Sequence, residues 1–164
     1  TPPPLILSRQ YIPDLPAPHG EDRYTAALGA LKGGYTVMAA ENPDVVLVAN
    51  GSEVSLLCEV AVLLEAEGIK ASVVSMPSVG LFNTQPEEYR ASVLPVGVKQ
   101  FGLTAGLPVS LRMIDGFNGK VFGLERFGAS APYKVLDEQF GFTTHNILAC
   151  VCEYIGKEVP DMPH

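Results

Sequence analysis

The residue types that carry most protein chemistry are few and scattered in this sequence. The histidines His19, His145 and His164 stand in a proline-rich segment, at the start of an expected helix and at the last position. Their spacing does not group them into a metal site, so each is expected to be a solvated or capping side chain. A nucleophile elbow of the Gly-x-Ser-x-Gly type, a Gly-x-Gly-x-x-Gly turn and a P-loop are all absent from the sequence. The sequence therefore offers none of these nucleophile or phosphate-binding motifs.

The cysteines and the paired glutamates also favour structural roles. Cys58, Cys150 and Cys152 are odd in number, and the last two flank a single valine. Residues two apart on a helix do not face each other, so they are poor zinc co-ligands and are expected to be buried thiols of a reducing compartment. Glu87 and Glu88 are neighbours on an expected helix and diverge. They are therefore expected to be solvated rather than to act as an acid–base couple.

The turn Asn50-Gly51-Ser52-Glu53 is the first candidate for a binding site. It follows an apolar run and opens a helical pattern, and free amides at a helix N-terminus can bind an anion. The alternative is structural: Gly51 gives the turn its backbone freedom, and Ser52 caps the helix by accepting a hydrogen bond from an early amide. The structural interpretation is favoured, because most caps of this kind hold no ligand.

The stretch ERFGASAPYKVL, residues 125–136, is the most distinctive in the sequence. Gly128 to Ala131 are small, and Pro132 can begin a helix. Small side chains permit another backbone to approach closely. The stretch is therefore either a structural loop that leads into a helix or a contact with another domain or subunit, and the residues alone leave these two interpretations about equal.

Strand-like and helix-like patterns alternate along the chain and would position these residues. A continuous apolar run, expected of a strand buried on both faces, occupies residues 45–49, and a second buried strand is expected near 70–76. Further strands are expected at 34–39, 98–104 and 120–125. Helices are expected at 53–67 up to Gly68, at 86–93, at 107–114, at 132–140 closed by Gly141, and through 146–155 with Thr144 as the cap.

This alternation predicts an α/β fold with a doubly wound, mostly parallel sheet and helices on both faces. We expect about five strands, four parallel and one antiparallel at an edge. Residues 11–23, with three prolines, a glycine and scattered charge, predict a linker or extended loop before this unit.

The composition of the chain indicates a single domain and disfavours some classes of binding partner. The 164 residues suit one domain, with 47% apolar and 18% charged residues. Eighteen acidic residues outnumber eleven basic ones, giving a formal net charge of -7, which disfavours nucleic acid and anionic membranes as partners. No apolar run approaches the roughly 20 residues that span a bilayer.

Five stretches in order resemble the C-terminal part of transketolases, with dihydroxyacetone synthase a close relative. They are LILSRQ, KGGYTV, NPDVVLVANGSEVSL, EEYRASVLP and GLERFGASAPYKVL. The resemblance covers nearly all of the chain. It implies that residues 1–23 are the end of a preceding pyrimidine-binding domain with its linker, and that residues 24–164 are the C-terminal domain of a longer enzyme.

The resemblance also implies a function. The full-length enzyme would move a two-carbon ketol unit between ketose and aldose phosphates in the pentose phosphate pathway, as a homodimer. Thiamine diphosphate with Mg or Ca would supply the covalent chemistry from domains outside this chain, so no catalytic residue, cofactor or metal ligand is expected here. Arg9 of the Leu-Ser-Arg-Gln motif would bind the terminal phosphate of the sugar, with pairing to a local carboxylate as the alternative. The expected location is cytoplasmic, with plastid and peroxisome left open.

Two rival interpretations remain. One is a free-standing doubly wound module that binds a phosphate or nucleotide at Ser52, and the other is an interaction protein that uses the small-residue stretch. One position also departs from the family's pattern, since Thr104 stands where a glutamate is usual, and the chain has no tryptophan. A contact made by that glutamate in the family is not expected here.

Overall fold

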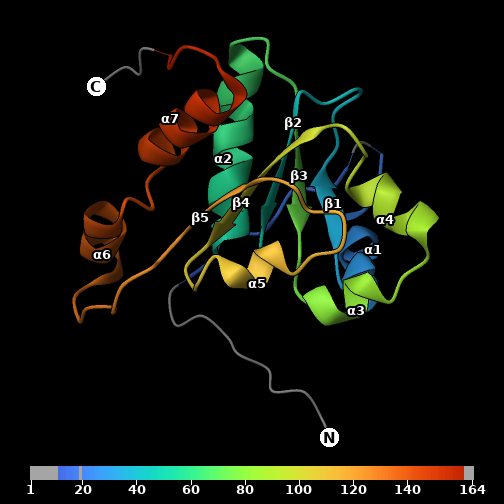
Figure 1. Ribbon diagram of the computed structural model, residues 1–164, viewed down its shortest axis with the longest axis horizontal. Helices are drawn as coiled ribbons and strands as arrows, with labels where there is room; N and C mark the ends of the chain where they lie inside the picture. The colour runs from blue at the N-terminus through green and yellow to red at the C-terminus, as the bar shows by residue number, and fades with distance from the viewer. Residues whose placement is uncertain (1–10, 19, 161–164) are drawn as a thin grey trace, which may run out of the picture.

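A five-stranded sheet organises the protein, as the computed structural model shows for residues 11–18 and 20–160 (Figure 1). The strand order is β1-β3-β2-β4-β5, in which β2 to β5 are parallel and β1 runs antiparallel to β3 at one edge. This arrangement confirms the predicted fold class. The strands are β1 (Tyr35–Met38), β2 (Val45–Ala49), β3 (Ala71–Ser75), β4 (Lys99–Thr104) and β5 (Lys120–Gly123).

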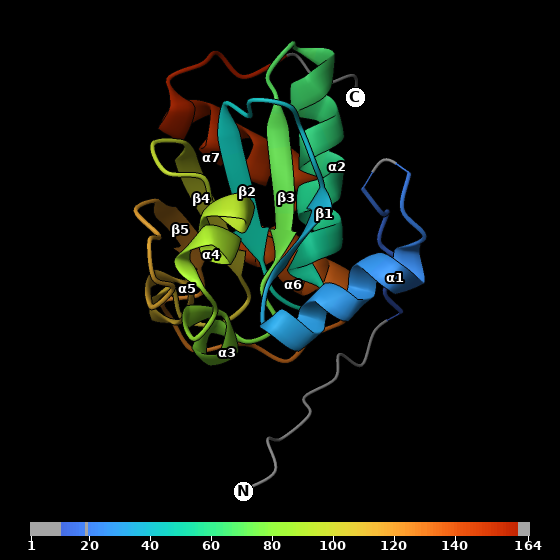
Figure 2. The same cartoon turned by 90° about the vertical axis from the view of Figure 1, so that its right-hand side faces the viewer.

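Helices cover both faces of the sheet (Figures 1 and 2). One face is covered by α2 (Glu53–Ala66) and α7 (Thr144–Ile155), and the other by α3 (Val79–Asn83), α4 (Glu87–Val93) and α5 (Val109–Arg112). Three further helices complete the described chain: α1 (Arg23–Ala27), the 3-10 helix η1 (Leu28–Lys32) and α6 (Tyr133–Phe140).

The central strand β2 separates two apolar cores. All five of its residues are fully buried. Val45, Leu47 and Ala49 pack on the side of α2 and α7, whereas Val46 and Val48 pack on the side of α3 to α5. Burying one such side chain stabilises the fold by roughly 1.5–3 kcal/mol, and burial on both faces explains why this strand reads as an unbroken apolar run.

Short helices were the elements that the sequence did not predict. α1, η1 and α3 have five residues each, too few for an apolar periodicity to be recognised. α3 depends on its surroundings instead: Ser78 caps it by accepting a hydrogen bond from the amide of Leu81, and Phe82 is fully buried against the sheet. Packing, rather than local propensity, therefore fixes this helix.

The start of α7 differs from the prediction by one residue. Thr143, not Thr144, is the cap: its backbone is extended, and its hydroxyl oxygen accepts a hydrogen bond from the amide of Asn146 at 3.3 Å. Thr144 is the first helical residue, and its hydroxyl donates to Glu59 on α2 at 2.7 Å. The prediction was wrong because only an extended residue can turn its side chain back to the third amide of a helix.

The predicted linker contains no helix or strand from residue 11 to 18. It nevertheless contacts the domain, because half-buried Leu15 packs against the core and Asp14 forms an ion pair with Arg23. α1 begins at Arg23, the last residue of the predicted linker. None of the helices among residues 11–18 and 20–160 is long and apolar enough to cross a membrane.

Candidate functional site

The carboxyl ends of the parallel strands meet at one edge of the sheet, where doubly wound folds usually bind ligands. After β2 comes the turn at residues 50–52, after β4 the segment 105–108, and after β5 the loop 124–132. The Ser52 turn and the small residues 128–131 that the sequence singled out lie in these segments, and Thr104 is the last residue of β4 before one of them.

The Ser52 turn is not capped as predicted. Gly51 has a left-handed backbone, with φ of 63°, as its expected freedom requires. Ser52, however, already has helical backbone angles, and its side chain accepts no capping bond. Its hydroxyl instead donates to the Glu53 carboxylate at 2.8 Å, and its carbonyl accepts from the hydroxyl of Ser55 at 2.8 Å. The predicted cap was wrong because the helical backbone points the Ser52 oxygen away from the amides that follow.

A cavity of about 250 Å³ lies beside this turn, and its charge is unfavourable for an anion. Three carboxylates line it, those of Glu53, Glu59 and Asp137, together with the tyrosines Tyr11 and Tyr133. Burial raises the pKa of Asp137 above its ordinary value. Among the described residues that line the cavity there is no lysine or arginine to offset these carboxylates. This chemistry disfavours a phosphate or nucleotide at the turn.

Thr104 closes β4 and shapes the next segment. Its side chain is buried, and its hydroxyl oxygen accepts a hydrogen bond from the amide of Gly106 at 3.1 Å. The Gly106 carbonyl in turn accepts from the amide of Leu124 at 3.0 Å, just beyond the end of β5. Thr104 therefore has a structural role in holding the segment after β4 against the segment after β5.

The approach of these two segments requires Gly123. A methyl group at this position would lie 2.9 Å from the Gly106 carbonyl oxygen and 3.0 Å from the ring of Pro108. A glycine at the end of β5 thus lets the segments after β4 and β5 touch, and it sets where the loop 124–132 leaves the sheet.

The small-residue stretch has no backbone packed against it in the described part of the chain. Residues 125–135 are exposed, and a methyl group added at Gly128 would meet nothing within 4 Å. Phe127 is 97% exposed, whereas the Arg126 guanidinium lies 5.5 Å from the ring centre of Phe140 on α6. The exposed phenylalanine and its small neighbours leave this loop open to contact by another chain or domain.

Apolar side chains are also exposed on α5 and beside it. Leu107, Val109 and Met113 are each more than half exposed, and Leu81 on neighbouring α3 is 41% exposed. We call these four residues the α5 surface.

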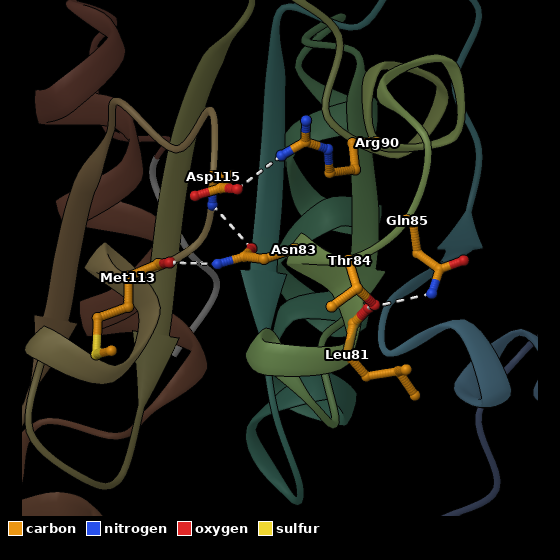
Figure 3. A network of polar contacts seen from close by, with 7 residues as sticks. All are labelled: Leu81, Asn83, Thr84, Gln85, Arg90, Met113 and Asp115. Carbon is orange, nitrogen blue, oxygen red and sulfur yellow. Dashed lines mark hydrogen bonds and ion pairs between the residues drawn. The ribbon is translucent and has the colours of Figure 1, made fainter.

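A polar network fixes the helices that carry the α5 surface (Figure 3). The Asn83 amide donates to the Met113 carbonyl at 2.9 Å and accepts from the amide of Asp115 at 3.0 Å. Arg90 on α4 then donates to the Asp115 carboxylate at 2.7 Å. Through Asn83, the end of α3 is tied to the residues after α5.

The other singled-out residues do not form a site. His145 and the pair Glu87 and Glu88 are exposed, as predicted. Cys58 and Cys152 are buried free thiols, and burial, with Glu59 nearby, raises the pKa of Cys58 to about 11. Such a thiol stays protonated and unreactive.

Arg9, the predicted phosphate ligand, lies outside the described residues, as do His19 and His164. Within residues 11–18 and 20–160, no three histidine, cysteine or carboxylate side chains are placed to hold a metal. The sequence had no signal for the acidic cavity, because its members come from α2, α6 and the segment before α1.

The fold and this edge define a class: a doubly wound α/β domain whose strand ends carry exposed contact segments. Residues 33–143 match the family described as the transketolase-like TK C-terminal domain. The chain belongs to this family.

Known transketolases are similar in sequence to most of this chain. The transketolase of Staphylococcus aureus strain MW2 is 43% identical over 150 residues, which are 90% of this chain and 22% of that protein. The transketolase of Geobacillus stearothermophilus is 39% identical over 159 residues, covering 93% of this chain and 23% of that protein. A crystal structure of a mutant transketolase from Pichia stipitis superposes with a TM-score of 0.76, at 35% identity, over 92% of this chain and 21% of that chain. The chain thus spans about a fifth of the relatives it matches.

Proposed function

We propose that this chain is the C-terminal domain of a transketolase. Such an enzyme transfers a two-carbon ketol unit from a ketose phosphate to an aldose phosphate. The observation that carries the proposal is the match of residues 33–143 to the C-terminal domain family. Its similarity to the Pichia stipitis transketolase supports the substrate class, because that enzyme has been crystallised with sedoheptulose 7-phosphate. Transketolase is preferred to dihydroxyacetone synthase because the relatives named above are transketolases.

The described residues do not fit thiamine diphosphate. The cavity at the strand ends is lined by Glu53, Glu59 and Asp137, which would repel a diphosphate. We propose that the cofactor and its Mg or Ca ion are held by other parts of the full-length enzyme, where the cofactor supplies the covalent chemistry of ketol transfer.

The proposed role of this chain is to pack against the rest of the enzyme. Phe127, the small residues at 128–131 and the α5 surface would be covered by other domains of the polypeptide or by the second subunit of a homodimer. Their exposure supports this role, because contiguous exposed apolar side chains mark surfaces that a partner covers. Residues 1–23 would join this domain, 24–164, to the preceding one.

We propose that Arg9 binds the terminal phosphate of the sugar substrate. A guanidinium offers a planar fork of donors that suits phosphate oxygens. We also propose a cytoplasmic location for the enzyme.

A comparison of two exposed apolar residues in the full-length polypeptide tests the packing role. Phe127→Ser is expected to weaken dimerisation, measured by sedimentation velocity, and to lower ketol transfer, because a buried aromatic anchor is lost. The control is Val62→Ser, which changes a residue that is 56% exposed on α2. Equal dimerisation and activity of the two variants would refute packing through Phe127.

The rival of a free-standing phosphate-binding module loses support from the acidic cavity beside Ser52. A stand-alone interaction protein would use the same exposed loop. Enzyme activity distinguishes the two roles. A longer polypeptide that also contains the preceding domains is expected to catalyse ketol transfer if this chain is a transketolase domain, but not if it is a stand-alone interaction protein.

A further inference from the structure

A second cavity lies at the opposite end of the sheet from the strand ends described above. Its volume is about 450 Å³, within the range of small-molecule sites. Its walls come from α4, the segment that leads into β4, the residues after α5 and the last turn of α7. We propose that this cavity binds a small organic anion that carries a carboxylate or phosphate head group on a ring-sized apolar body.

Arg90 is the first reason. It lines the cavity, and its Nη1 is occupied by the Asp115 carboxylate at 2.7 Å (Figure 3). Its Nε atom is buried and has no hydrogen-bond partner among the described residues. Because Nε is buried, the donors that a bound oxygen atom can reach are those of the rest of the guanidinium, whose side chain is 26% exposed.

Lys99 is the second reason. It is the first residue of β4 and lines the cavity, and its ammonium donates to the Ile155 carbonyl at the end of α7, at 3.0 Å. That acceptor is neutral, and Lys99 forms no ion pair with the described carboxylates, whereas Lys120 on the next strand pairs with Glu153. Its charge is thus available to an anion.

The charged side chains that line the cavity balance one another. Asp115 is neutralised by Arg90, to which it is paired. Glu87 is the other carboxylate at the cavity, and it lies exposed in the first turn of α4. The charge of Glu87 balances that of Lys99. The site is therefore expected to select an anionic head group chiefly through the directed hydrogen-bond donors of Arg90 and Lys99.

An aromatic and aliphatic wall accounts for the apolar body of the ligand. The Tyr154 ring lines the cavity, and its position is fixed by Phe101, whose ring centre is 6.3 Å away. Leu94 and Val98 add aliphatic surface beside it. A flat ring on the tyrosine would place its anionic substituent near Lys99, whose ammonium is 5.8 Å from the centre of the Tyr154 ring.

Binding of phenyl phosphate to the 164-residue chain tests the proposal. In an NMR titration of labelled protein, we expect shifts that concentrate at residues 90–100 and 115–118 and at Tyr154. Benzoate distinguishes a carboxylate head group from a phosphate one, inorganic phosphate tests the need for the ring, and phenol tests the need for the charge. We expect phenyl phosphate or benzoate to bind more tightly than both inorganic phosphate and phenol.

Lys99→Met is expected to weaken this binding about tenfold or more, because a charge-assisted hydrogen bond is lost. The matched control is Lys120→Met, since this lysine also begins a strand at the same end of the sheet but does not line the cavity. Both variants should keep the fold, because both lysines are exposed. Equal affinities of the two variants, equal binding of phenol, or shifts located away from these residues would overturn the proposal.

Discussion

Substitution of Gly123 by alanine tests how the strand ends are assembled. The added methyl group would lie 2.9 Å from the Gly106 carbonyl oxygen and 3.0 Å from two carbons of Pro108. The first contact is with backbone, so it can be relieved only by moving the segment after β4. Such overpacking costs about 1–3 kcal/mol, partly offset by the roughly 0.5–1 kcal/mol that alanine gains over glycine within a strand.

For a protein of this size, 1 kcal/mol corresponds to about 2–4 °C in the melting temperature. The net cost is about 0–2.5 kcal/mol, so Gly123→Ala is expected to lower the melting temperature of the 164-residue chain by up to roughly 10 °C, measured by differential scanning calorimetry. Gly128→Ala is the matched control, because nothing lies within 4 Å of the new methyl group. It should keep the melting temperature or raise it by a few degrees, because alanine restricts the unfolded chain more than glycine does. A Gly123→Ala variant as stable as this control would refute the close approach.

Three further predictions follow from the described contacts and from the family. Thr143→Ala should destabilise the chain by about 1 kcal/mol through loss of the α7 cap, and Thr143→Ser should not; urea unfolding measures both. Cys58 should react with iodoacetamide at pH 8 far more slowly than in the urea-unfolded chain, and faster as the pH approaches its raised pKa of about 11; equal rates by mass spectrometry would contradict this. Arg9→Ala in the full-length enzyme should raise KM for phosphorylated sugars roughly ten- to a hundredfold, and much less for unphosphorylated ones; equal losses in steady-state kinetics would exclude phosphate binding.

The fold could be predicted from sequence because its strands are buried on both faces. β2 has five consecutive apolar residues, and that pattern does not depend on any distant partner. Local details were harder. Ser52 and Thr143 both precede a helix in the sequence, yet only Thr143 caps one, because the backbone angles at each position are set by the packing of neighbouring elements.

The sites at the two ends of the sheet could be predicted only in part. The stretch at 125–136 is contiguous, so its small residues and its phenylalanine stood out together. The cavity near β4 combines Arg90 and Lys99, from the consecutive elements α4 and β4, with Tyr154 from α7 far along the chain. No spacing rule brings such residues together, and the free Nε atom of Arg90 is visible only in three dimensions.

Ketol transfer by two polypeptides tests the central claim most directly. One is the 164-residue chain, and the other is the longer polypeptide that includes the residues before Thr1. Each is given xylulose 5-phosphate, ribose 5-phosphate, thiamine diphosphate and Mg. The chain alone should unfold cooperatively on heating but produce no sedoheptulose 7-phosphate, while the longer polypeptide should produce it. Turnover by the chain alone, or none by the folded longer polypeptide, would contradict the account of a packing domain in a transketolase.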